Sequence, residues 1–96
     1  MTDAFQQLTS SAHSLAQYSG SDSERTIQRM CNHYPAASSG ERVMIRAALS
    51  CVPRAWLPEE AADVDPFRIS DCTMLDNGNA VALLRALAVQ LGIELR

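Results

Sequence analysis

The chain contains no lysine. All eight of its basic residues are arginine, while alanine occupies 14 of the 96 positions. We attribute this bias first to the codon usage of a GC-rich genome and only second to selection for guanidinium chemistry. The formal net charge of −3 argues against an overall electrostatic attraction to nucleic acids, although it leaves local basic patches open. The charge is uneven, because residues 1–58 carry five arginines against four acids and residues 59–96 carry three against seven.

The cysteines lack paired spacing. Cys31, Cys51 and Cys72 lack the C-x-x-C pattern and His13 and His33 lack the H-x-x-x-H pattern of zinc sites, so the sequence predicts no metal site. An odd number of cysteines without paired spacing is typical of a reducing compartment. The first residues also lack the basic and apolar regions of a secretory signal, so we expect a cytoplasmic protein without cofactors.

No specific catalytic or nucleotide-binding motif occurs in the sequence. Cys31 and His33 supply the atoms of a nucleophile and a base, but no surrounding sequence marks an activated thiolate. Cys31 also falls on the apolar stripe of its predicted helix, where a free cysteine packs as a small hydrophobe. In a chain of this size, the absence of such motifs favours a binding or regulatory protein over an enzyme. An enzyme that uses Cys31 and His33 is the weakest hypothesis.

The composition predicts a single all-α domain over residues 1–96. Apolar residues make up 47% of the chain and charged residues 20%, as in globular proteins, and the length leaves no room for a second domain. Alternation typical of a short extended segment occurs only at 93–95. We therefore predict a small bundle of four to five helices around a hydrophobic C-terminal helix at about residues 80–91.

Residues 80–91 are the longest apolar stretch, with ten apolar residues among twelve. At roughly 1.5 Å per residue this helix is about 18 Å long, too short for the ~30 Å hydrocarbon core of a bilayer. A helix that is apolar on nearly every side belongs in the centre of a domain, or, as the alternative, in a homodimer seam. Leu84→Asp is then expected to unfold the protein. Asn77 or Asn79 can cap the helix start, and Gly92 stands where a left-handed cap ends a helix.

Three amphipathic helices are predicted earlier in the chain. Residues 3–18 carry a narrow apolar stripe at helical spacing. Capping boxes of the form Ser-x-x-Glu at residues 21–24 and 38–41 each open a helix, and these two helices end at Pro35 and Pro53. Because the two helices resemble each other in sequence and follow closely, we interpret them as one αα-hairpin.

Residues 53–76 combine the only tryptophan with a run of acids. From residue 59 to residue 76 there are six acids and one arginine, and short helical pieces are expected at 58–63 and 70–75. Trp56 suits an interface anchor, although a place at one end of the core is weighed slightly higher. Exposed carboxylates can attract a basic partner surface. The predicted partner-binding residues are Trp56, Leu57, Glu59, Glu60, Asp63 and Asp65.

Two pairs of arginines provide an alternative site. Arg25 and Arg29 lie four residues apart on one predicted helix and Arg42 and Arg46 on the next, so each pair points to one side and can grip phosphates. An antiparallel hairpin would place the two pairs at opposite ends. The ordinary interpretation, a solvated face with local contacts between glutamate and arginine, is therefore favoured over a nucleic-acid site.

These features lead to two functional hypotheses. The first is a small non-enzymatic protein-binding or regulatory module, an inhibitor or adaptor of bacterial or phage origin that acts on a nucleic-acid-handling complex through its acidic segment. Its partner is a protein with a basic surface. The second is a helical domain that binds DNA or RNA through the paired arginines. We expect a monomer or a homodimer, with no membrane partner.

Overall fold

A computed structural model of the chain describes residues 3–18 and 22–93. These residues form α-helices and short 3-10 helices and no β-strand, which confirms the all-α class. The α-helices are α1 (Asp3–Ser11), α2 (Ser23–His33), α3 (Ser39–Ser50) and α4 (Asn77–Leu91). The 3-10 helices are η1 (His13–Tyr18), η2 (Tyr34–Ala36), η3 (Arg54–Trp56), η4 (Glu59–Asp63) and η5 (Ile69–Met74).

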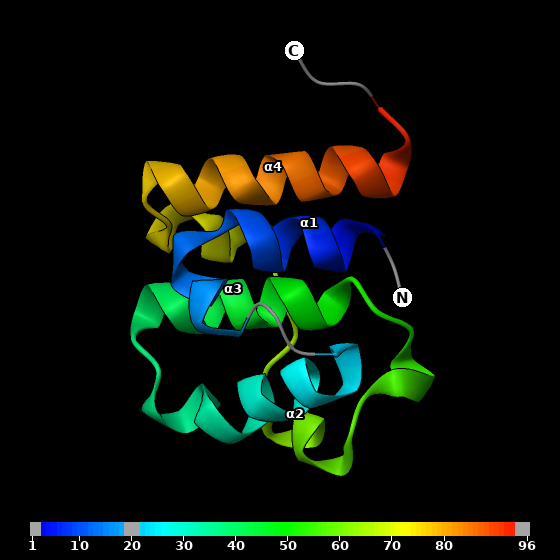
Figure 1. The fold of residues 1–96 in the computed structure, drawn as a ribbon. Helices are drawn as coiled ribbons and strands as arrows, with labels where there is room; N and C mark the ends of the chain where they lie inside the picture. The colour runs from blue at the N-terminus through cyan, green and yellow to red at the C-terminus, as the bar shows by residue number, and fades with distance from the viewer. Residues whose placement is uncertain (1–2, 19–21, 94–96) are drawn as a thin grey trace.

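The α-helices stack in the order α4, α1, α3, α2 (Figure 1). α1 packs between α4 and α3, and α3 also contacts α2. The connection from α3 to α4 covers other sides of the stack, because η4 packs against α2 and η5 packs against α3. α4 is therefore an outer layer. Within the described residues, no helix combines the length and apolarity needed to cross a bilayer.

The prediction that the C-terminal helix forms the centre of the bundle is wrong. The residues that α4 buries are mostly small: Asn79, Ala82, Leu83, Ala86 and Ala88. Apart from Leu83, its larger apolar residues are between 41% and 68% exposed, namely Val81, Leu84, Leu87, Val89 and Leu91. Ala82 and Ala86 let α1 approach closely on one face, whereas Ala88 lies on the other side of the helix, among Val81, Leu84 and Ile93. Leu84 is 59% exposed, so the expectation that Leu84→Asp unfolds the protein loses its basis.

The core centres on α3 instead. The buried residues of this helix are Val43, Met44, Ile45, Ala47, Ala48 and Leu49. Phe5 and Leu8 of α1 and Ile27 and Met30 of α2 belong to the same apolar cluster. Because α3 has neighbours in the stack on both sides and η5 beside it, apolar residues around much of its circumference are covered.

Residues 3–18, predicted as one helix, form α1 and η1 instead. Near the end of α1, the hydroxyl groups of Thr9 and Ser10 donate to backbone carbonyls one turn earlier, at 3.0 and 2.6 Å. Such hydroxyl groups compete with the helix's own hydrogen bonds and bend it. The chain then continues as the tighter η1, which buries Leu15 and Tyr18.

The caps of the helical hairpin follow the sequence in part. Ser38 caps α3 as predicted, because its hydroxyl accepts the N–H of Glu41 at 3.3 Å. α2 is capped by Asp22, whose carboxylate accepts the N–H of Arg25 at 2.8 Å. The predicted cap, Ser21, lies outside the described residues. The prediction thus placed both the cap and the start of α2 one residue too early.

α4 starts three residues before the predicted apolar run. Asp76 caps it by accepting the N–H of Asn79 at 2.8 Å, so Asn77 and Asn79, the predicted caps, lie inside the helix. At the other end, Gly92 has φ 70° and ψ 25°, which confirms the predicted left-handed cap. Residues 94 and 95 of the predicted extended tail lie outside the described residues.

Candidate protein-binding groove

A groove of about 820 Å³ lies between the C-terminal half of α3 and the segment that follows it. The apolar part of its lining comes from Leu49, Val52, Leu57, Ala61, Val64 and Phe67. Charged side chains also border it, namely Arg46, Arg54, Glu59 and Asp65. A volume of this size lies within the range of clefts that bind small molecules and is open enough for part of a peptide.

The wall of the groove owes its shape to prolines. Pro53 follows the end of α3, Pro58 precedes η4, and Pro66 follows it, so the chain cannot continue as one long helix between them. The short turns that result return Leu57 and Phe67 to the protein, where both are partly buried against the core. The segment therefore stands as a wall beside the C-terminal half of α3.

Trp56 lies at the end of η3 and is 45% exposed. It does not belong to the apolar core cluster and does not line the groove. Its neighbour Leu57 lines the groove and is partly buried against the core. The placement of Trp56 at one end of the core, which the sequence analysis weighed slightly higher, is therefore wrong. The indole is an exposed group, and its residue directly precedes the groove-lining Leu57 in the sequence.

The four predicted acids are all exposed, but they do not form one set. Glu59 and Asp65 line the groove, and Glu60 and Asp63 do not. The side chain of Gln28 on α2 donates to the carboxylate of Glu60, so this carboxylate is directed toward α2. The backbone N–H of Glu60 itself, and then Gln28, hold the pKa of Glu60 below its ordinary value. The structure thus brings Leu57, Glu59 and Asp65 together and leaves the other predicted residues beside them.

Arg46 connects α3 to this segment, a role that was not predicted from the sequence. Its Nε donates to the hydroxyl of Tyr34 at 2.6 Å, and its guanidinium lies 5.7 Å from the centre of that ring. It also pairs with Asp71 at 3.3 Å and with Asp65 at 3.7 Å. The Tyr34 hydrogen bond, and then Asp71, raise the pKa of Arg46. No local spacing indicates these contacts, because the partners are distant in the sequence.

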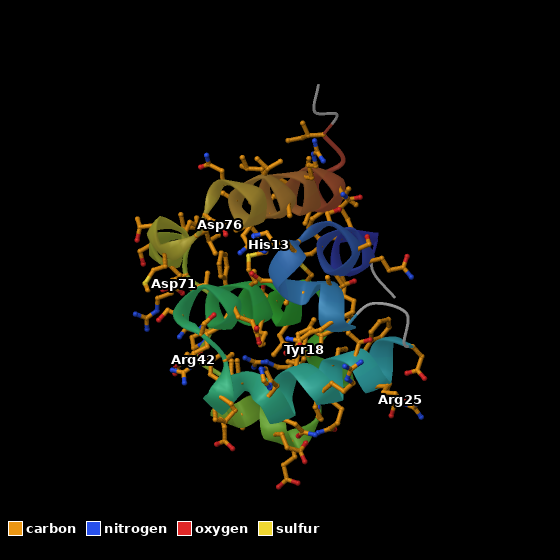
Figure 2. All side chains as sticks on the ribbon, turned by 60° about the vertical axis from the view of Figure 1, so that its left-hand side comes forward. His13, Tyr18, Arg25, Arg42, Asp71 and Asp76 are labelled. Atoms are coloured by element: carbon orange, nitrogen blue, oxygen red, sulfur yellow. The ribbon has the colours of Figure 1, made fainter. Side chains whose placement is uncertain are left out.

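Most of the arginines of the alternative nucleic-acid site make contacts within the protein. Arg42 donates to two carbonyls of η2 at 3.2 and 2.6 Å, and Arg29 donates to a carbonyl of η1 at 3.0 Å. Arg46 is engaged as described above, and Arg25 is exposed. Arg25 and Arg42 lie far apart in Figure 2, near opposite ends of the hairpin. The structure therefore does not bring the four arginines together in one patch.

Tyr18 reaches from η1 to α3, where its hydroxyl donates to Glu41 at 3.2 Å. Burial, and then the negative charge of Glu41, raise the pKa of Tyr18 to about 12. The same carboxylate lies 3.1 Å from Nε2 of His33. Glu41 therefore links η1, α2 and α3.

Cys31 and His33 are not arranged as a nucleophile and its base. Cys31 is buried, and its burial together with the charge of Glu60 raises the pKa of the thiol, which disfavours the reactive thiolate. His33 is instead paired with Glu41. Among residues 3–18 and 22–93, no three His, Cys, Asp or Glu side chains are grouped as metal ligands would be.

Comparisons with known proteins return no match: no family model, curated protein or solved structure is significantly similar to this chain. Function has to be inferred from sites rather than from the fold, since one fold can support many functions. The groove and the exposed surfaces around it are therefore the candidate binding sites of this protein.

Proposed function

We propose that this chain is a non-enzymatic protein-binding module whose groove receives a short segment of a partner protein that carries basic and apolar residues. The groove carries the proposal, because an apolar floor, the carboxylates of Glu59 and Asp65, and the nearby exposed Trp56 occur together. Burial of an apolar side chain on the floor would drive association. The carboxylates would attract a cationic partner, and a tryptophan of this kind can hold a complex together.

The charges around the groove favour a basic ligand over an acidic one. Two arginines line the groove: Arg46 is paired with Asp71 at 3.3 Å and more loosely with the exposed Asp65 at 3.7 Å, and Arg54 lies on η3, before the acidic segment. From residue 59 to residue 76, six acids face a single arginine, so the field over this segment is negative. Phosphates would be repelled by it, whereas lysine or arginine side chains would be attracted.

The specific form of this proposal is an inhibitor or adaptor of a nucleic-acid-handling complex. Proteins of that kind present basic surfaces for their own ligands, and an acidic surface can occupy them. We place the protein in a bacterial or phage setting and in the cytoplasm. None of the three cysteines, all of which lie in the described residues, forms a disulfide, which suits a reducing compartment and supports the cytoplasmic part of the proposal.

A peptide selection tests the ligand chemistry. A displayed random-peptide library is selected on the wild-type protein after depletion on a Glu59→Lys/Asp65→Lys variant. We expect enriched peptides with lysine or arginine next to an apolar residue. Their binding should change the fluorescence of Trp56, which reports on this region alone because it is the only tryptophan. Enriched peptides without a basic bias, or no enrichment at all, would contradict the proposal.

Variant kinetics with a selected peptide then test the position of the site. Glu59→Lys/Asp65→Lys should slow association about tenfold at low salt. The control, Glu60→Lys/Asp63→Lys, changes the net charge equally but lies outside the groove, so its effect should be clearly smaller. Equal slowing by both pairs would mean that only the long-range field matters and that the groove is not the site.

Trp56→Ala tests the anchor separately. Loss of an aromatic anchor should raise the dissociation rate about tenfold or more and leave association nearly unchanged. The circular dichroism spectrum should stay the same, because Trp56 lies outside the core. An unchanged dissociation rate would remove Trp56 from the proposed site and leave the groove lining alone.

A further inference from the structure

The outer face of α4 is an apolar surface that the groove does not explain. α4 contributes no residue to the groove lining. Its outward apolar residues, with Ile93 just beyond the helix, expose on the order of 500 Å², which is near the upper end of the largest apolar patches on monomeric proteins. In Figure 1, α4 has α1 on one side and no other described element on the opposite side. Patches of this size are often functional.

The face combines a protrusion and a hollow. Leu84 protrudes, with 59% of its surface exposed. One turn further along the helix, Ala88 lies at the bottom of a hollow of about 390 Å³, whose rim includes Leu84, Val81, Arg85 and Ile93. Knobs of this kind pack into hollows of a facing helix in helix pairs. A second α4 would bring a knob and a hollow with the same separation.

We propose that the outer face of α4 binds a second copy of this chain, with the two α4 helices antiparallel across a twofold axis near residue 86. The stripe Val81, Leu84, Ala88, Leu91 has steps of three, four and three residues, so it reads the same in both directions. Such an axis places Leu84 of each copy over Ala88 of the other. It also places Val81 of each copy beside Leu91 of the other, so that every contact occurs twice, as a twofold interface requires.

The available area fits a dimer of this kind. A standard interface covers about 800 Å² on each partner, and about 65% of a homodimer interface is apolar, which corresponds to roughly 520 Å² per copy. The apolar area exposed by α4 is of that size. The remaining third would come from the polar rim of the same face, to which Gln7 and Arg85 contribute.

The charge on this face is confined to one edge. Arg85 is the only charged residue of α4 and lies at the edge of the stripe, where its long side chain can reach water. The twofold axis brings the Arg85 residues of the two copies near each other on this edge, so the pairing requires both guanidinium groups to stay solvated, where water and salt weaken their repulsion. The antiparallel orientation sets the helix dipoles against each other favourably.

Sedimentation equilibrium over a wide concentration range tests the dimer. We expect the average mass of the wild type to approach twice the monomer mass, while Leu84→Glu stays monomeric with an unchanged circular dichroism spectrum. Ile69→Glu is the matched control, because Ile69 is 85% exposed on η5 and lies off this face. It should dimerise like the wild type. A wild type that stays monomeric at its highest attainable concentration, or dimerisation that survives Leu84→Glu, would overturn the proposal.

Cysteine pairing tests the register. Val81→Cys and Leu91→Cys proteins are mixed and oxidised, with the wild type as the control for its three native cysteines. We expect a disulfide between the two variants, because residues 81 and 91 of different copies lie side by side. Each variant alone should not link to itself, since its two cysteines would be about 15 Å apart along the helix. A self-linked Val81→Cys dimer would overturn the antiparallel pairing.

The dimer does not depend on the proposed function of the groove. Leu84→Glu should bind the selected basic peptide as the wild type does, because Leu84 is not part of the groove lining. Failure of peptide binding in all variants would reject the groove and leave the sedimentation result unaffected.

Discussion

By composition, α4 should be the central helix and α3 an outer one, but the structure has them the other way round. α4 has a single charged residue and lies at the surface, whereas α3 carries Glu41, Arg42 and Arg46 and forms the centre of the core. The difference lies in the neighbours. α3 is packed by α1, α2 and η5, and its arginines leave the core along the ring of Tyr34, to which both are stacked. The apolar content of a helix therefore indicates how much surface it can bury, and not whether its own chain covers that surface.

The largest expected effect comes from the same substitution placed in each helix. Met44→Asp should abolish cooperative unfolding, because Met44 is fully buried and an unpaired buried charge costs several kcal/mol against a total stability of roughly 5 to 15 kcal/mol. Leu84→Asp should change the free energy of unfolding of the monomer by about 1 kcal/mol or less. Urea titration of both variants, at a concentration where each is monomeric, measures this difference. If Leu84→Asp does not fold, the result would support the prediction that α4 is the central helix.

A smaller effect should follow from removing the link between α3 and the groove wall. Arg46→Met removes the hydrogen bond to Tyr34 and the ion pair with the half-buried Asp71, and should lower the free energy of unfolding by about 2 kcal/mol. Arg25→Met, at an exposed position of α2, is the control and should stay within about 0.5 kcal/mol of the wild type. Chemical denaturation measures both. Similar values for the two would show that α3 does not depend on this link.

Replacing a glycine of α3 and the glycine that caps α4 by alanine should change the free energy of unfolding in opposite directions. Gly92→Ala should destabilise the protein by about 1 kcal/mol, because the cap of α4 needs a positive φ of 70°. Gly40→Ala should stabilise it by about 0.5 kcal/mol, since the added Cβ would lie 3.9 Å from the nearest atom, the carbonyl oxygen of Met74, in a helical position. Thermal unfolding followed by circular dichroism compares them. Destabilisation by both would mean that the start of α3 is more tightly packed than the structure shows.

The smallest expected difference concerns pH. The N–H of Asn79, and then His13, hold the pKa of Asp76 below its ordinary value. The carboxylate therefore stabilises the start of α4 at neutral pH, and this contribution is lost as the pH falls through the lowered pKa. The hydroxyl of Ser38, which caps α3, does not titrate. In acid, the amide hydrogen-exchange protection factor of Asn79 should therefore fall more than that of Glu41.

The control for this measurement is Asp76→Asn, which retains a capping oxygen without a charge. Protection of the Asn79 amide should then no longer follow the pH in this range. A pH dependence that survives the substitution would assign the effect to another group.

Interactions between residues close in the sequence were the predictable part of this protein. The all-α class, the cap by Ser38, the left-handed end at Gly92 and the short helical turns of the acidic segment all follow from such contacts. The exceptions at this level are also local. Asp22 and Asp76 replaced neighbouring residues as caps, because several residues with capping side chains stand next to each other there.

Only the tertiary structure decided which helix is central and where the groove lies. Three of the six predicted binding residues, Leu57, Glu59 and Asp65, line the groove, but its other wall comes from α3. The contacts of Arg46 with Tyr34 and Asp71 join residues that are distant in the sequence, so no spacing indicates them. An apolar pattern indicates that one face of a helix must be buried, but it does not indicate which other element buries that face. That choice depends on how all the faces of the chain fit together, which is why α3 is enclosed and α4 remains available to another molecule.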